Sequence, residues 1–181
     1  MKIGRTWAMP NPNTFACRPI GGFVVDWIRG ISADPFARNT GLATYTNDLN
    51  PDTNADYHMD AADFLLMLGE RGVRLDCCLF DPPYSPRQIS ECYQSIGRKV
   101  TGKDTQNAAL YKRVRDAIDP LMVPGGVVLS FGWNSGGMGK TRNYKIEEIL
   151  MVAHGGAHND TICMAECKVV ESKPEQQRLV E

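Results

Sequence analysis

The sequence predicts an α/β fold with a mostly parallel β-sheet and an antiparallel hairpin at its C-terminal end. Short apolar runs alternate with segments whose apolar residues recur at helical spacing, which is the pattern of strand-helix-strand units. Two of the apolar runs show no alternation, as expected for strands buried on both faces. Near the C-terminus two further apolar runs flank the glycine- and Asn/Asp-containing segment GGAHND. Such a segment between strands is typical of a hairpin turn.

The bulk composition predicts one ordinary globular domain. The chain has 181 residues, 43% of them hydrophobic and 23% charged, with a formal net charge of −1. A binder that relied on phosphate attraction alone would be more basic, so any nucleic-acid contact must come from a local patch. We expect a single domain over residues 1–170 and a charged tail over 171–181. No membrane is expected as a partner, because no apolar run is long enough to span one.

The cytoplasm is the expected location. The N-terminal stretch MKIGRTWAMPNPNTF lacks the apolar core of a signal peptide. The six cysteines lie in apolar segments, and in a reducing compartment they are expected to be small buried hydrophobic residues.

The individual elements follow from periodicity and from start and stop residues. Residues 1–14 are rich in Pro and Asn and are expected to be irregular. Helices are expected over 19–29, 61–72 and 108–122. Asp60 is the expected N-cap of the second helix and Gly72 its stop. Strands are expected over 31–34, 43–46, 55–59, 73–80 and 123–131, and the hairpin strands over 146–154 and 161–170.

Four carboxylates each come just past an apolar run: Asp34, Asp48, Asp60 and Asp81. In open α/β sheets ligands bind outside the carboxyl ends of the strands. One such aspartate alone would be a solvated turn residue, but four together predict a binding site at this edge.

The segment Asp81-Pro82-Pro83-Tyr84 predicts a rigid, non-helical exit from the strand that precedes it. Two prolines fix φ and remove two backbone donors. The carbonyls of the segment and the Asp81 carboxylate are then available as acceptors, which suits an exocyclic amine that has two N–H groups. Tyr84 can present its ring to a planar base. The lone pair of an amine held in this way is free to attack an electrophilic methyl group, and Asp81 or a water relay can take the proton.

This segment resembles the catalytic motif of DNA amino-methyltransferases, which act on adenine N6 or cytosine N4. Asp at the first position favours adenine. Two further segments resemble motifs of the same family. FACRPI, residues 15–20, is similar to F-x-x-K-P, and DPFA, residues 34–37, is similar to the cofactor loop D-P-F-x-G. TNDLNP and HGGAHND are similar to segments of small phage and prophage adenine methyltransferases.

The resemblance implies a Rossmann-like fold, S-adenosyl-L-methionine as cofactor, and DNA as substrate. The catalytic residues it implies are Asp81, Pro82, Pro83 and Tyr84. The cofactor-binding residues it implies are Phe15, Pro19, Asp34, Pro35, Phe36, Asp48, Asp60 and Ala61. Among these, Asp34 and Phe36 would lie beside the methionine moiety. Asp48 would accept from the ribose hydroxyls, and Asp60 from the adenine amine of the cofactor.

The sequence departs from the family pattern in the cofactor loop. Arg38 stands where the family has glycine, a residue that allows close backbone approach to a ligand. Arg38 either pairs with the carboxylate of the cofactor or marks weakened binding. Only eight residues separate Asp34 from Ala43, where a parallel crossover needs about a dozen or more. We therefore expect an irregular loop in place of a helix there.

A basic stretch over residues 85–115 is the candidate DNA-binding region, because it adjoins the catalytic motif. The candidate phosphate contacts are Arg87, Arg98, Lys99 and Lys103. Each of these taken alone could equally belong to a solvated face. No metal is expected, since His154 and His158 have metal-like spacing but lie in a turn sequence.

The sequence therefore predicts a DNA adenine-N6 methyltransferase. Two alternatives remain open: an RNA or other amino-group methyltransferase, and a catalytically decayed nucleic-acid-binding module. The oligomeric state is also open, a homodimer included.

Overall fold

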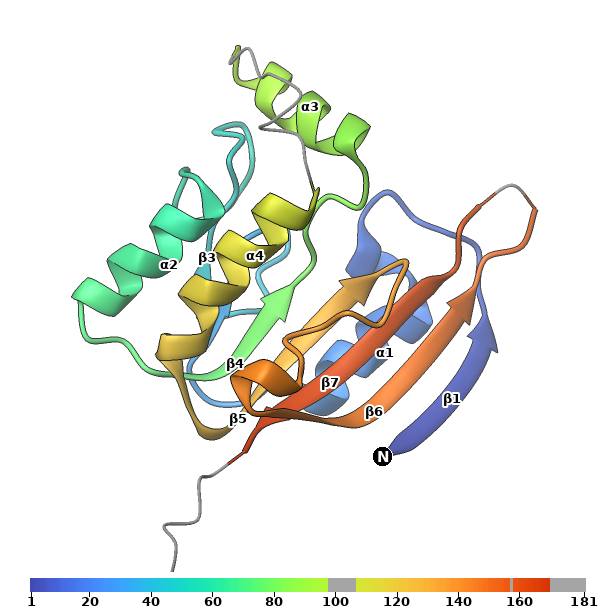
Figure 1. The fold of residues 1–181 in the computed structure, drawn as a ribbon. Helices are drawn as coiled ribbons and strands as arrows, with labels where there is room; N and C mark the ends of the chain where they lie inside the picture. Colours follow the sequence, from blue (N-terminus) through green and yellow to red (C-terminus); the bar gives the residue numbers. More distant parts are fainter. Residues whose placement is uncertain (98–106, 157, 170–181) are drawn as a thin grey trace, which may run out of the picture.

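The computed structural model describes residues 1–97, 107–156 and 158–169. Within these residues seven strands form one sheet, in the order β1-β6-β7-β5-β4-β2-β3 (Figure 1). The strands are β1 (Lys2–Trp7), β2 (Ser32–Asp34), β3 (Tyr45–Thr46), β4 (Leu75–Phe80), β5 (Met122–Gly132), β6 (Tyr144–Ala153) and β7 (Thr161–Lys168). Only the two pairings made by β7 are antiparallel. The predicted parallel sheet with an antiparallel C-terminal hairpin is confirmed.

Helices cover both faces of the sheet. They are α1 (Arg18–Trp27), α2 (Ala61–Glu70), α3 (Pro86–Ser95) and α4 (Asn107–Ile118), with short 3-10 turns η1 (Thr14–Ala16), η2 (Asp119–Leu121) and η3 (Lys140–Arg142). Figure 1 shows α2 and α4 on one face and α1 on the other. Asp60 caps α2 as predicted, its carboxylate accepting from Ala62 N at 3.0 Å. Gly72 follows this helix with a φ of +74°, which glycine adopts without strain.

The central strands contribute side chains to two separate cores, which explains why their sequences show no polar alternation. On β4, Cys78 and Phe80 pack with α2 and α4, whereas Cys77 and Leu79 pack with α1. All four are almost completely buried. Full burial of a large apolar side chain contributes about 1.5–3 kcal/mol. The strand that carries the Asp-Pro-Pro-Tyr motif is therefore fixed from both sides.

Two expectations about single elements are wrong, and one helix was not predicted. Residues 2–7, expected to be irregular, form the edge strand β1 parallel to β6. This strand keeps Ile3 and Trp7 more than half exposed, so its sequence carries no burial pattern. The expected strand over 55–59 is a single bridge between Asn47 and Tyr57. Helix α3, which the sequence did not predict, has the largely polar sequence PRQISECYQS.

The connection from β2 to β3 is an irregular loop, as predicted from its length. The buried side chain of Asn47 stabilises it. Its amide donates to the carbonyls of Pro35 and Met59 at 3.1 and 3.0 Å, and its oxygen accepts from Met59 N at 3.1 Å. One buried, fully paired amide thus fixes three chain segments at the carboxyl edge of the sheet.

The predicted charged tail, residues 171–181, lies outside the described residues. Among the helices of the described part of the chain, none is long and apolar enough to cross a lipid bilayer.

Candidate functional site

The four aspartates singled out in the sequence all lie at one edge of the sheet. Asp34 ends β2, Asp48 follows β3, Asp81 follows β4, and Asp60 begins α2. The strands β3, β2 and β4 are consecutive neighbours, so their carboxyl ends meet at this edge. The negative charges of Asp81 and Asp48 both raise the pKa of Asp34, which places these carboxyl groups within electrostatic reach of one another.

Asp34 is a completely buried carboxyl group. One oxygen accepts from Phe36 N at 3.0 Å, and Thr40 Oγ1 lies 3.5 Å from the other. Burial, reinforced by the charges of Asp81 and Asp48, raises the pKa of Asp34 to about 8. At neutral pH this group is therefore mostly protonated, and a cation placed beside it would favour its ionised form.

Asp48 is held by the loops around it. Oδ2 accepts from Arg38 N at 3.0 Å, and Oδ1 accepts from Asn50 N at 2.8 Å. An ionised carboxylate has about four acceptor positions, so each oxygen retains capacity for a further donor. The geometry thus leaves Asp48 able to accept from two hydroxyl groups.

Asp60 already has a cationic partner. Its Oδ2 accepts from Arg113 at 2.6 Å and from the Tyr93 hydroxyl at 3.1 Å, while its Oδ1 caps α2. Arg113 lies on α4 and Tyr93 on α3, both far along the chain from Asp60. The sequence pattern did not identify either partner, because a long-range ion pair leaves no local spacing.

The Asp-Pro-Pro-Tyr segment leaves β4 without regular secondary structure and leads into α3. The Tyr84 hydroxyl donates to Asp81, and Tyr84 N donates to Gln88 Oε1 at 2.6 Å. Burial raises the pKa of Asp81, while the hydroxyls of Tyr84 and Thr14 lower it. The Pro83 carbonyl accepts from the Tyr111 hydroxyl at 3.0 Å. The Pro83 carbonyl thus already has one donor within the protein and keeps one further acceptor position.

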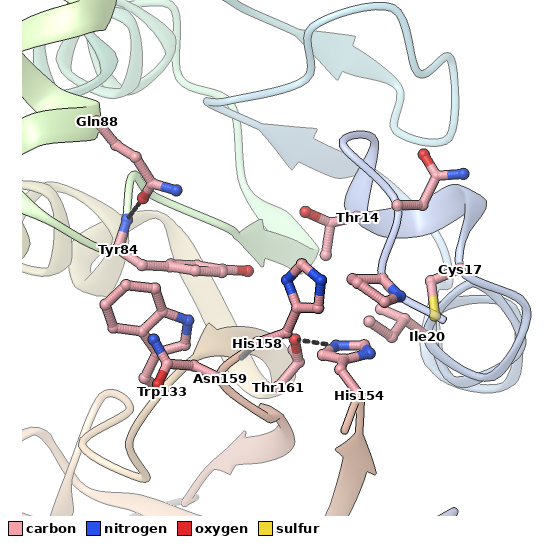
Figure 2. A pocket seen from close by; sticks show the side chains of 12 residues that line it. Thr14, Cys17, Ile20, Tyr84, Gln88, Trp133, His154, His158, Asn159 and Thr161 are labelled. Carbon is pink, nitrogen blue, oxygen red and sulfur yellow. Dashed lines mark hydrogen bonds between the residues drawn. The ribbon is translucent and has the colours of Figure 1, made fainter. Parts of the chain in front are cut away.

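A cavity of about 280 Å³ opens beside Tyr84 (Figure 2). The rings of Tyr84 and Trp133 meet edge to face, with their centroids 5.8 Å apart. Besides Tyr84, the polar residues that line the cavity are Asn11, Thr14, Gln88, His154, His158, Asn159 and Thr161. The cavity thus places aromatic rings beside hydrogen-bonding groups.

His154 has a structural role in the wall of this cavity. Its Nδ1 lies 2.8 Å from the Ala8 carbonyl and its Nε2 lies 2.9 Å from Thr161 Oγ1. A carbonyl only accepts, so Nδ1 carries a proton. With both ring nitrogens engaged, His154 is not available as a metal ligand. Within the described residues no cluster of three or more His, Cys, Asp or Glu side chains could hold a metal ion.

The remaining predicted cofactor residues lie on different elements. Phe15 lies in η1 and packs on Phe131, with ring centroids 5.0 Å apart. Pro19 lies in the first turn of α1. Phe36 packs on Phe80, 6.3 Å between centroids, and Ala61 is buried at the start of α2. Pro35 is buried, and its carbonyl accepts from Asn47.

The predicted DNA contacts are described only in part. Arg87 is on α3, 87% exposed, and pairs with Glu91 at 2.7 Å. Arg98, Lys99 and Lys103 lie outside the described residues. Tyr93 and Arg113 belong to the stretch 85–115 that was predicted to bind DNA, but both contact Asp60, which the sequence did not predict. Thr14 was not predicted as a site residue, since no motif marks it.

Comparison with known proteins defines the class of fold. No protein-family model matches the chain, and no curated protein matches it in sequence. Among solved structures, TrmN from Thermus thermophilus matches with a TM-score of 0.53 at 15% identity over 83% of this chain and 49% of its own. NSun6 from Pyrococcus horikoshii, solved with SFG, gives 0.52 at 14% identity over 78% and 48%. The putative methyltransferase SMU.776, complexed with SAH, gives 0.53 at 10% identity over 76% and 44%.

The chain has the Rossmann-like fold of S-adenosylmethionine-dependent methyltransferases. It spans about half the length of these three structures. Identities this low establish the fold, and what the protein does has to be argued from its own site.

Proposed function

We propose that this protein is an S-adenosylmethionine-dependent methyltransferase that acts on the N6 amine of a flipped adenine in DNA. The observation that carries the proposal is the position of Asp81-Pro82-Pro83-Tyr84. The motif follows β4, between the carboxylates that follow β2 and β3 on one side and the aromatic cavity on the other. The methyltransferase fold supports it.

The residues present fit the cofactor. S-adenosylmethionine carries a positive sulfonium that bears the methyl group, an ammonium beside a carboxylate, and a ribose diol. Asp34 is buried with no cationic partner among the described residues, and it would ionise when a cation arrives. Asp48 has acceptor capacity for the diol. Asp60 has one oxygen with spare capacity for the adenine amine.

When bound, S-adenosylmethionine supplies an electrophilic methyl group. The chain would hold and orient the amine that receives it. The Asp81 carboxylate accepts from the hydroxyls of Tyr84 and Thr14, and with about four acceptor positions it keeps capacity for a further donor. Together with the Pro82 carbonyl it would accept from the two amine N–H groups. Asp81, or water in contact with it, would take the proton that leaves. The contribution of the protein is positioning and electrostatic stabilisation, with no covalent enzyme intermediate.

The aromatic cavity would receive the base. A base inside a duplex is out of reach, and flipping it out costs a few kcal/mol. Stacking on an aromatic side chain recovers about 1–3 kcal/mol per base. Tyr84 and Trp133 are the rings available for this contact. Arg87, Arg98, Lys99 and Lys103 remain the proposed phosphate contacts.

The experiment is methyl transfer from labelled S-adenosylmethionine to duplex DNA, single-stranded DNA and total RNA, with identification of the modified nucleoside by mass. N6-methyladenine in the DNA digest supports the proposal. Label only in RNA refutes the substrate, and no label with a folded protein refutes the activity. Asp116→Ala, a change at an exposed helix carboxylate, is the control for handling losses.

A further inference from the structure

Arg38 is one of two non-glycine residues of the described chain in the left-handed region, with a φ of +52°. It stands at the position where the resembling family has glycine. The left-handed conformation costs a side-chain-bearing residue about 1–2 kcal/mol. Strain of this kind persists where surrounding contacts enforce it, and it is concentrated at functional sites. The contacts of Arg38 should therefore show what holds its backbone in this conformation.

Two contacts fix Arg38. Its backbone N–H donates to Asp48 Oδ2 at 3.0 Å, and its Nη1 donates to the Pro12 carbonyl at 2.6 Å. The side chain therefore crosses from the loop after β2 to the segment before η1. On one side of this contact the chain carries Asp34 and Phe36, which are assigned to the methionine moiety. On the other side it carries Phe15, which is assigned to the cofactor site.

The charge around Arg38 is otherwise negative. Asp34, Asp48 and Asp81 lie at the same edge, and the Arg38 guanidinium lowers the pKa of Asp81 against the effect of burial. Carboxylates suit the cationic groups of S-adenosylmethionine and repel its anionic carboxylate. A guanidinium has five N–H donors, and the Pro12 carbonyl takes one of them. The remaining donors match a carboxylate, which arginine binds in bidentate fashion.

We infer that Arg38 binds the carboxylate of the methionine moiety, and so selects an amino-acid-bearing cofactor over the same nucleoside without that carboxylate. This inference rests on the proposed function. Arg38, which departs from the family pattern, thus determines specificity for the cofactor. The aspartates bind the cationic groups of the ligand, and Arg38 binds its carboxylate.

The test is calorimetric binding of S-adenosylmethionine and of decarboxylated S-adenosylmethionine to the wild type and to Arg38→Gly. Glycine suits the left-handed backbone, so this variant is expected to fold. The wild type should bind the carboxylated ligand about tenfold or more tightly, as expected for a charge-assisted contact. Arg38→Gly should bind the two ligands within about threefold of each other, its affinity for the decarboxylated ligand unchanged. Arg38→Lys should retain part of the preference.

The outcomes separate this inference from the proposed function. If neither ligand binds the folded wild type, the proposed function fails. If the wild type binds both ligands equally, or if Arg38→Gly weakens both by the same factor, Arg38 only joins two loops and the inference is overturned. Asn143→Gly is the matched control, because Asn143 also has a positive φ, of 61°, and lies before β6 in another part of the fold. It should leave both affinities unchanged.

Discussion

Asp34 and Asp60 were both predicted to bind the cofactor, but the structure places them in different electrostatic environments. Asp34 is fully buried beside other carboxylates, and its pKa is raised to about 8. Asp60 is ion-paired with Arg113, hydrogen-bonded to Tyr93 and engaged in capping α2. Among the described residues Asp34 has no cationic partner, whereas Asp60 is paired with Arg113. We therefore expect the energy of cofactor binding to be concentrated at the end of β2.

The largest effect is expected at the Asp-Pro-Pro-Tyr motif, whose Asp81 lies within electrostatic reach of Asp34. Asp81→Ala should lower the rate of methyl transfer by about 10²–10⁴-fold, because it removes the acceptor for the amine and its proton. Affinity for S-adenosylmethionine should change little. The measurement is single-turnover methyl transfer together with calorimetric binding, with Asp116→Ala as the control. Wild-type turnover in Asp81→Ala would show that the assigned mechanism is wrong.

Asp34→Asn should weaken binding of S-adenosylmethionine at pH 8 by about tenfold to a hundredfold, since it removes a charge-assisted contact to a cation. Affinity of the wild type should rise with pH between about 6 and 8, as Asp34 becomes easier to ionise, and level off above. Binding by the variant should not depend on pH in this window. Calorimetric titrations at pH 6, 7 and 8 give the comparison. Equal pH dependence in the two proteins would exclude Asp34 as the cause.

The same substitution should stabilise the protein without ligand. The pKa of Asp34 is higher in the folded than in the unfolded chain, where it is near 3.8. The unfolded state therefore loses its proton first, and the contribution of Asp34 to stability falls as pH rises from about 4 to 8, by up to about 1.4 kcal/mol per pH unit. Asp34→Asn should remove this loss, so that its urea midpoint exceeds that of the wild type at pH 8 and approaches it at pH 4. A lower midpoint at pH 8 would contradict the assignment.

Asp60→Asn should have a smaller effect on cofactor affinity, less than about fivefold. Asparagine also caps helices, so α2 keeps its first turn. The lost ion pair is half exposed at Arg113 and should cost less than about 1 kcal/mol of stability. Binding and urea unfolding of Asp60→Asn beside Asp34→Asn test the comparison directly. A larger loss of affinity in Asp60→Asn than in Asp34→Asn would reverse our ranking of the two sites.

The smallest effect is expected for the free energy of unfolding of Arg38→Gly. Relief of the left-handed backbone in Arg38→Gly is offset by loss of the hydrogen bond to Pro12, so stability should change by less than about 1 kcal/mol. Asn143→Gly should gain less from relief of strain, because asparagine tolerates this conformation. Urea unfolding of both variants gives the measurement. A loss beyond about 2 kcal/mol in Arg38→Gly would mean that its contacts mainly hold the fold together.

The sequence predicted those features that depend on local pattern. The buried runs that became β4 and β5, the cap at Asp60 and the irregular loop after Asp34 all follow from composition and spacing over a few residues. Strand β1 was missed because its side chains remain exposed, and α3 because it is largely polar. The Arg113–Asp60 pair and the Thr14 contact to the motif join residues far apart in the chain. No local pattern encodes them, and only the assembled sheet brings them together.

The measurement that tests the central comparison most directly is proton exchange on binding. S-adenosylmethionine is titrated at pH 7 in two buffers of different ionisation enthalpy, into the wild type and into Asp34→Asn. A cation that docks on a carboxyl group of pKa about 8 displaces its proton, so the wild type should release close to one proton per ligand bound and the variant close to none. Equal proton release in the two proteins, or none in a wild type that binds, would contradict the account that Asp34 receives the positive charge.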